Sequence, residues 1–213
     1  MKNMAPESRA EFRFGVVILA AGLSTRMGQP KLLLPWRDTS VLGHLLQTWA
    51  GLDAKQIAVV CATGAHEIHA ELDRLRFAAA DRITNPHPEA GMFSSIQCAA
   101  RWPNWQPDLS HFAIALGDQP HLRQRTLEQL LDFTATHRER ICQPLAVGRR
   151  LHPVVLPREV FVKLRSSPAS DLKQFLQTMP ELLAGLEPYD PGLDLDLDSP
   201  ADYARARALA DSE

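Results

Sequence analysis

The residues nearest the start of the chain that could do chemistry are two cations, Arg26 and Lys31, beside a loop of small residues. The loop Ala20-Ala21-Gly22 ends an apolar run, and Ser24 and Gly28 flank the arginine. Small residues let the backbone approach a ligand closely, and successive N–H groups in such a loop can converge on phosphate oxygens. Arginine adds a planar fork of donors and lysine a mobile point charge. The pattern predicts a triphosphate cradle, with a solvent-facing turn as the alternative.

Two familiar phosphate-binding patterns do not fit this loop. The pattern G-x-x-x-x-G-K-[ST] fails because Gly22 and Gly28 are too far apart and no lysine follows Gly28 directly. The pattern G-x-G-x-x-G fails because the loop has no paired glycines. We therefore expect a phosphate site of another type.

Asp118 is the first candidate metal ligand. It follows the apolar run Phe112–Leu116 within Gly117-Asp118-Gln119-Pro120. Open α/β sheets bind their ligands at the carboxyl ends of parallel strands, and Pro120 turns the chain out of the sheet. An aspartate in a turn is also common, so a purely structural role is the alternative.

A run of aspartates alternates with leucines near the C-terminus. In an extended segment Asp194, Asp196 and Asp198 would share one face. Like charges on one face repel unless a cation or solvent offsets them. The pattern indicates either a solvated acidic edge strand, which we favour for Asp194, or a cation site. Ser199 should then cap a final helix with Pro200 at its first position.

A second polar segment follows a short expected strand at 82–84. It contains Asn85-Pro86, and we expect Ser94 or Ser95 to cap a helix that starts after Gly91. The free N–H groups of a helix start can bind an anion, here a nucleotide. An ordinary capped turn is the alternative.

The composition is that of a globular protein with ample material for a core. The chain has 213 residues, of which 45% are hydrophobic and 23% charged. The formal charge of −2 argues against a broad surface for nucleic acid or an anionic membrane, so local cations must meet any phosphate. Cys61, Cys98 and Cys142 form no CxxC pair, which argues against a disulfide framework or zinc site and favours a reducing compartment.

No targeting or membrane-spanning segment is evident. The run Val16–Ala21 is too short for a signal-peptide core or a membrane span. We expect a cytoplasmic protein with a flexible N-terminal tail over residues 1–13 and a single domain over residues 14–213.

Apolar runs and amphipathic stretches alternate along the chain. We expect buried strands near 16–21, 56–62, 112–116 and 141–147, and helices capped by Thr39 or Ser40, after Gly64, before His137, at 171–179 and after Ser199. Because the strands are apolar and the connections short, we expect an α/β fold with a mostly parallel sheet and helices on both faces.

The first loop resembles the signature of the MobA-like nucleotidyltransferases, which activate sugars and cofactors. L-A-A-G-x-S-x-R-M-G-x-x-K, followed by Leu-Leu-Pro, spans Leu19 to Pro35. The resemblance implies a three-layer Rossmann-like nucleotidyltransferase fold from Val16 to Tyr203. It continues in Asn85-Pro86, Gly91-Met92-x-Ser94-Ser95, Gly117-Asp118-Gln119-Pro120 and Asp196-x-Asp198-Ser199-Pro200.

The resemblance implies roles for individual residues. Arg26, Lys31 and Asp118 would be catalytic, with the two cations on the phosphates of a nucleoside triphosphate. Asp118 and Asp198 would bind Mg²⁺. The implied nucleotide-binding residues are Leu19, Ala20, Ala21, Gly22, Ser24, Arg26, Lys31, Asn85, Gly91, Ser94 and Ser95.

The acceptor side departs further from the family pattern. Leu151 stands where relatives carry a glycine before His-Pro, and the stretch 168–173 lacks their Gly-Asp-x-Gly. The residues implied to face the acceptor are His152, Arg149 and Asp196. A structural histidine before a strand and an arginine facing water are the alternatives.

Within the family the chain is most similar to members that transfer a cytidylyl group to the molybdenum cofactor. The implied reaction is attack by the phosphate of a molybdopterin-type acceptor on the α-phosphate of CTP, which releases pyrophosphate; a molybdoenzyme would receive the product. The Ala20-Ala21-Gly22 form resembles that of cytidylyl- and uridylyl-transferring relatives, whereas guanylyl-transferring ones more often have a double glycine there, and our hypothesis for the donor is CTP. The alternatives are a cytidylyl- or uridylyltransferase acting on a phosphorylated sugar or alcohol, and a non-catalytic chaperone that binds nucleotide and cofactor.

Overall fold

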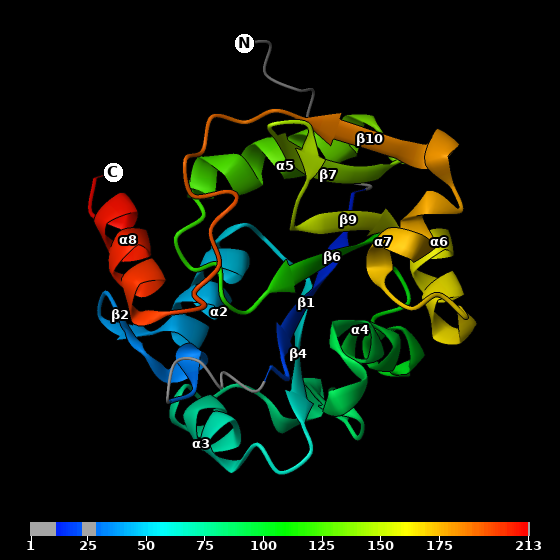
Figure 1. The fold of residues 1–213 in the computed structure, drawn as a ribbon. Helices are drawn as coiled ribbons and strands as arrows, with labels where there is room; N and C mark the ends of the chain where they lie inside the picture. The colour runs from blue at the N-terminus through cyan, green and yellow to red at the C-terminus, as the bar shows by residue number, and fades with distance from the viewer. Residues whose placement is uncertain (1–11, 23–28, 213) are drawn as a thin grey trace.

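A twisted sheet runs through the middle of the molecule (Figure 1). The computed structural model describes residues 12–22 and 29–212. Over these residues the sheet has eight strands in the order β10-β7-β9-β6-β1-β4-β5, and β8 pairs with β7. Their bounds are β1 Phe14–Ala20, β4 Gln56–Ala62, β5 Arg82–Asn85, β6 His111–Leu116, β7 Ile141–Ala146, β8 Arg149–Arg150, β9 Val154–Pro157 and β10 Leu183–Leu186.

The central strands are parallel, as their apolar sequences predict. β1 lies between β4 and β6 and is parallel to both, and its Val16, Val17 and Ile18 have no exposed surface. Such burial on both faces is typical of parallel sheets. β9 runs antiparallel to β6 and β7, because the few residues that join it to β7 cannot form the long crossover that a parallel strand needs.

Helices cover both faces of the sheet and make three layers, which confirms the predicted fold class (Figure 1). On one face Val16 and Ile18 of β1 belong to an apolar cluster that includes residues of α2, α3, α5 and α8; on the other face Val17 belongs to a cluster that includes residues of α4, α6 and α7. The helices are α2 Val41–Gly51, α3 His66–Arg74, α4 Met92–Arg101, α5 Gln124–Thr136, α6 Arg158–Lys163, α7 Leu172–Gln177 and α8 Pro200–Ala210.

Two predictions about local structure were wrong. Gly91, and not Ser94 or Ser95, is the N-cap of α4, because its φ of 88° and ψ of 178° suit glycine and let the helix begin at Met92. The aspartate run is not a strand, since residues 191–198 form turns and irregular backbone. Buried and more exposed residues still alternate along this segment, because Leu193, Leu195 and Leu197 pack into the core and the aspartates between them do not.

The helix ends follow their capping residues. Of the two predicted caps of α2, Thr39 and Ser40, it is Ser40 that accepts a hydrogen bond from the Gly43 N–H and starts the helix. Ser199 likewise starts α8, and Pro200 occupies its first position. Within the described ranges no helix combines the length and the apolar surface needed to cross a membrane.

Candidate active site

The ends of β1 and β6 form the base of the site. The two strands are neighbours in register, with Leu19 opposite Leu116, so the residues that follow them leave the sheet side by side. Gly117 fits here only because it has no side chain: a Cβ at this position would lie 2.5 Å from the Leu19 carbonyl oxygen. The fold thus places Asp118 next to the small-residue loop at the carboxyl edge of the sheet, where α/β proteins bind ligands.

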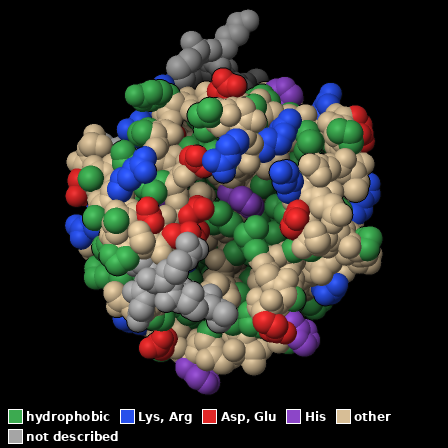
Figure 2. Space-filling view, in the orientation of Figure 1, with side chains coloured by type: hydrophobic (Ala, Val, Ile, Leu, Met, Phe, Trp, Pro, Cys, Tyr) green, Lys and Arg blue, Asp and Glu red, His purple; other side chains and the backbone are tan. Residues whose placement is uncertain are grey.

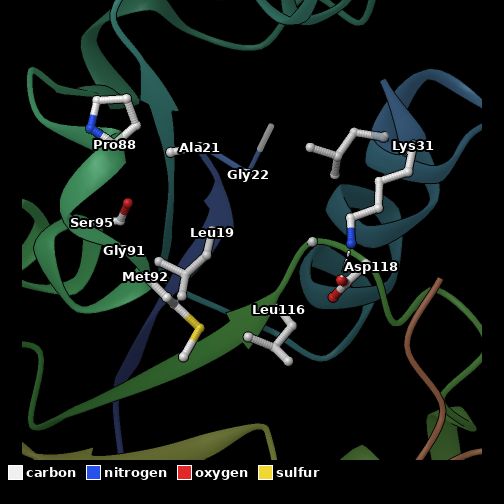
Figure 3. A pocket seen from close by; sticks show the side chains of 12 residues that line it. Leu19, Ala21, Gly22, Lys31, Pro88, Gly91, Met92, Ser95, Leu116 and Asp118 are labelled. Carbon is white, nitrogen blue, oxygen red and sulfur yellow. Dashed lines mark hydrogen bonds and ion pairs between the residues drawn. The ribbon is translucent and has the colours of Figure 1, made fainter. Parts of the chain in front are cut away.

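A cavity of about 300 Å³ opens at this edge. Figure 2 shows a hollow with hydrophobic side chains deep inside it and acidic side chains to one side. In Figure 3, Pro88, Ser95 and Met92 lie on one side of the cavity, and Lys31 and Asp118 lie together on the other. The lining residues are Leu19, Ala21, Gly22, Lys31, Leu32, Pro88, Gly91, Met92, Ser95, Leu116, Gly117 and Asp118.

Lys31 lies between two carboxylates. Its Nζ donates to Asp118 Oδ2 (Figure 3) and lies 3.4 Å from Asp198 Oδ1. The side chains of Lys31 and Asp118 are 16% and 18% exposed, whereas that of Asp198 is 41% exposed. Three segments distant in the chain therefore bring one cation and two anions together at the mouth of the cavity.

The two carboxylates suit a divalent cation. Both reach the same ammonium group, so their oxygens face a common cation position. No cluster of three or more His, Cys, Asp or Glu side chains able to hold a metal occurs in residues 12–22 and 29–212. Mg²⁺ is usually held by one or two carboxylates together with substrate phosphates and water, which is the donor set that Asp118 and Asp198 would provide.

Asp196 lies on the exposed side of the same cluster. Its Oδ1 accepts a hydrogen bond of 2.9 Å from Gln119 Nε2. Burial of the carboxyl group, and then the negative charge of Asp118, raise the pKa of Asp196. The sequence did not single out Gln119, although its position next to Asp118 is the signal that could have done so.

Asn85 supports the opposite wall of the cavity from behind. Its side chain is fully buried, and its Nδ2 donates to the hydroxyls of Ser94 and Ser95 at 2.8 and 2.9 Å. Its Oδ1 accepts from the His87 N–H at 2.9 Å. Because these bonds occupy the amide, Asn85 holds the turn in place and does not line the cavity. Of the predicted contacts on this wall, Gly91 and Ser95 line it.

The predicted acceptor residues lie outside the cavity lining. Arg149 on β8 makes an exposed ion pair with Asp194, with both carboxylate oxygens 2.9 Å from Nη1. His152 Nδ1 lies 3.3 Å from the Ile114 carbonyl oxygen, an acceptor, so this nitrogen carries the proton. Burial lowers the pKa of His152, which favours a neutral ring.

Some predicted nucleotide-binding residues do not line the cavity or lie outside the described part of the chain. Ser24 and Arg26, and with them Gly28, lie outside the described residues. Ala20 ends β1 and is buried in the core. Its neighbours Leu19 and Ala21 line the cavity, but Ala20 itself does not. Contact of any of these residues with a nucleotide stays a prediction.

Known proteins resemble the chain over most of its length. Molybdenum cofactor cytidylyltransferase of Escherichia coli (strain K12) is 27% identical over 195 residues, which cover 90% of this chain and 94% of that protein. The crystal structure of Rv0371c from Mycobacterium tuberculosis H37Rv matches with a TM-score of 0.70 and 25% identity, covering 92% of this chain and 98% of that one.

Two further structures share the fold. A complex of Rv0371c with manganese matches with a TM-score of 0.62 and 24% identity over 92% of this chain and 98% of that one. A nucleotidyl transferase from Methanothermobacter, Mth528, matches with a TM-score of 0.74 and 21% identity over 94% and 99% of the two chains. The model of the MobA-like NTP transferase domain matches residues 16–183. The chain therefore belongs to the MobA-like NTP transferase family of nucleotidyltransferases.

Proposed function

We propose that the protein transfers CMP from CTP to the phosphate of the molybdenum cofactor and releases pyrophosphate, with Mg²⁺ as its metal. The observation that carries the proposal is the meeting of Lys31, Asp118 and Asp198 beside the cavity. The choice of substrates is supported by the resemblance to the cytidylyltransferase along nearly the full length of both chains.

In this reaction a phosphate oxygen of the acceptor attacks the α-phosphorus of CTP. A new P–O bond forms as the bond to the β-phosphate oxygen breaks, and pyrophosphate leaves with the electron pair of that bond. Two anions must approach each other, so catalysis depends on positioning and charge neutralisation more than on a protein nucleophile.

The described residues supply parts of this chemistry. Lys31 brings a positive charge, largely shielded from water, to the side of the cavity where we place the triphosphate. Asp118 and Asp198 would hold the divalent cation, which when bound neutralises phosphate charge. Gly91 and Ser95 would contact the nucleoside from the opposite wall. The manganese complex of the structural neighbour supports a divalent cation in this fold.

The test is to incubate the protein and Mg²⁺ with each nucleoside triphosphate in turn, with or without the molybdenum cofactor, and to measure pyrophosphate. We expect release only with CTP and the cofactor together. Pyrophosphate release with GTP but with no other nucleoside triphosphate would reverse the choice of donor. Pyrophosphate release with a phosphorylated sugar in place of the cofactor would reverse the choice of acceptor. Transfer of cofactor to an apoenzyme without any pyrophosphate would favour a chaperone.

A further inference from the structure

The stretch that follows Asp118 holds the stretch that precedes Asp198 through a series of hydrogen bonds. The two stretches run past each other in opposite directions. The bonds join the Leu197 N–H to the Asp118 carbonyl oxygen at 3.2 Å, Gln119 Nε2 to Asp196 Oδ1 at 2.9 Å, His121 Nε2 to the Gly192 carbonyl oxygen at 2.9 Å, and the Arg123 N–H to Asp190 Oδ2 at 3.1 Å.

His121 lies at the centre of this series. Its side chain is buried, with 3% of the residue exposed, and the carbonyl of Gly192 can only accept, so Nε2 carries the proton. Gly192 packs directly on the ring, because a Cβ there would lie 2.6 Å from His121 Cδ2. The Gly192 N–H also donates to Asp190 Oδ1 at 2.9 Å. The ring and the Asp190 carboxylate therefore hold the backbone of one residue, the ring through its carbonyl oxygen and the carboxylate through its N–H.

Asp190 in turn is anchored to α5. Its Oδ2 accepts from the Arg123 N–H and, at 2.7 Å, from the Thr126 hydroxyl in the first turn of the helix. Residues 191–198 have no strand or helix of their own to fix their course. The buried leucines attach this segment to the core, but apolar contacts are non-directional, so the hydrogen bonds set its register.

We infer that His121 is a positioning residue for the divalent-metal site. Through Gly192 it sets where the chain leading to Asp198 runs, and so where the Asp198 carboxylate lies opposite Asp118. The inference rests on the proposed function only in taking Asp118 and Asp198 as the metal ligands. Partners that orient metal ligands typically change metal affinity 10- to 100-fold when they are lost.

The chain contains a matched control for this role. His111, at the other end of β6, is also 3% exposed, and its Nε2 lies 2.9 Å from the Arg138 carbonyl oxygen. Burial lowers the pKa of both histidines. The two differ in what they hold: His111 supports the amino end of the sheet, far along β6 from Asp118.

The experiment compares His121→Leu, His121→Gln and His111→Leu. Mn²⁺ affinity is measured by titration calorimetry in the full-length protein with a non-hydrolysable CTP analogue, and the Mg²⁺ dependence of pyrophosphate release is measured alongside it. We expect His121→Leu to weaken Mn²⁺ binding about tenfold. It should raise the half-saturating Mg²⁺ concentration by a similar factor, with turnover recovering at high Mg²⁺. His121→Gln keeps an N–H donor near Nε2 and should restore most of the affinity.

His111→Leu should lower the melting temperature but leave Mn²⁺ binding unchanged. If His121→Leu binds Mn²⁺ as the wild type does, while Asp118→Asn abolishes binding, the positioning role is wrong and the proposed metal site stands. If Mn²⁺ binding depends on neither Asp118 nor Asp198, the metal site of the proposed function fails. Should His121→Leu not fold, Asp190→Asn weakens the same anchor and should show the same shift.

Discussion

The two sides of the site differ in how firmly the fold holds them. On the cavity side, Lys31 and Asp118 are less than a fifth exposed and Asn85 is completely buried. On the side where the acceptor is predicted to bind, the ion pair of Arg149 with Asp194 leaves both side chains more than half exposed. One side is built into the sheet and the other lies on its rim.

The difference follows from the elements that carry each side. Leu19 and Asp118 lie at the carboxyl ends of central parallel strands, and the turn that leads into α4 is held by the buried Asn85. Arg149 belongs to a two-residue strand, and its partner Asp194 lies in a segment without strand or helix. Side chains on rigid elements keep their geometry, whereas loops accept substitution. A triphosphate site on the rigid side and a variable acceptor site on the rim fit this division.

Asp118→Asn, on the cavity side, should reduce turnover more than any other substitution considered. The change keeps the shape of the side chain but removes the charge that faces Lys31 and the cation position. We expect turnover to fall about 100- to 1,000-fold, as when one electrostatic contact to a transition state is lost. Pyrophosphate release measures turnover, and titration calorimetry measures CTP binding.

Asp194→Asn is the control for that change, because Asp194 lies in the exposed ion pair with Arg149. Exposed pairs contribute about 0–1 kcal/mol, so turnover should stay within about twofold of the wild type. Equal losses of turnover in the two variants would contradict the distinction between cavity and rim.

Asn85→Ala should have an intermediate effect, because it should both destabilise the protein and weaken nucleotide binding. It removes hydrogen bonds to two serine hydroxyls and one backbone N–H around the buried Asn85 side chain. Leaving these groups unpaired costs about 2–3 kcal/mol, or roughly 5–10 °C in the melting temperature of a protein this size. Because Ser95 lines the cavity, the KM for CTP should also rise severalfold.

Gln97→Ala separates the effect on stability from the effect on nucleotide binding, because Gln97 lies on α4, the helix that also carries Ser95. Gln97 donates to the carbonyls of Leu164 and Ser167 and does not line the cavity. We expect a lower melting temperature with an unchanged KM for CTP. If Asn85→Ala also leaves KM unchanged, the turn that it holds has no part in nucleotide binding.

Much of the fold follows from local sequence signals. The strand at Gln56–Ala62 has the predicted bounds, and Ser40 and Ser199 start helices as predicted, because a buried run or a cap acts over a few residues. β10 was not predicted. Its residues are only half-buried, and Gly185 is needed there because a Cβ would lie 2.7 Å from Leu145 of β7. Only the folded chain shows that requirement.

Some features of the site were likewise predictable from local motifs, and others were not. Motifs pointed to Lys31, Asp118 and Asp198, and the structure brings these three together. The contact between His121 and Gly192 spans residues far apart in sequence and has no local pattern, so nothing in the sequence predicted it. Asn85 was identified, but spacing along the chain does not show that its amide points into the core.

Asp196→Asn should have the smallest effect, and its sign depends on pH. Burial and the charge of Asp118 raise the pKa of Asp196 in the folded protein, so the folded state binds this proton more tightly than the unfolded state does. Stability therefore falls as pH rises from the unfolded pKa through the folded one, and the loss is complete above it. Removing the charge should raise the melting temperature in metal-free buffer at about pH 7 by roughly 1–2 °C.

That gain should disappear as the pH is lowered through the raised pKa of Asp196 towards the unperturbed aspartate value of about 3.9, because the wild-type carboxyl group is then protonated in the folded protein. Thermal melts of the wild type, Asp196→Asn and Asp194→Asn with a chelator present would show it. Added Mg²⁺ and CTP should stabilise the wild type more than Asp196→Asn if Asp196 supports the bound cation. A variant that is less stable than the wild type at every pH would mean that the hydrogen bond from Gln119 outweighs the repulsion from Asp118. Asp196 would then belong with the firmly held side of the site and not with the rim.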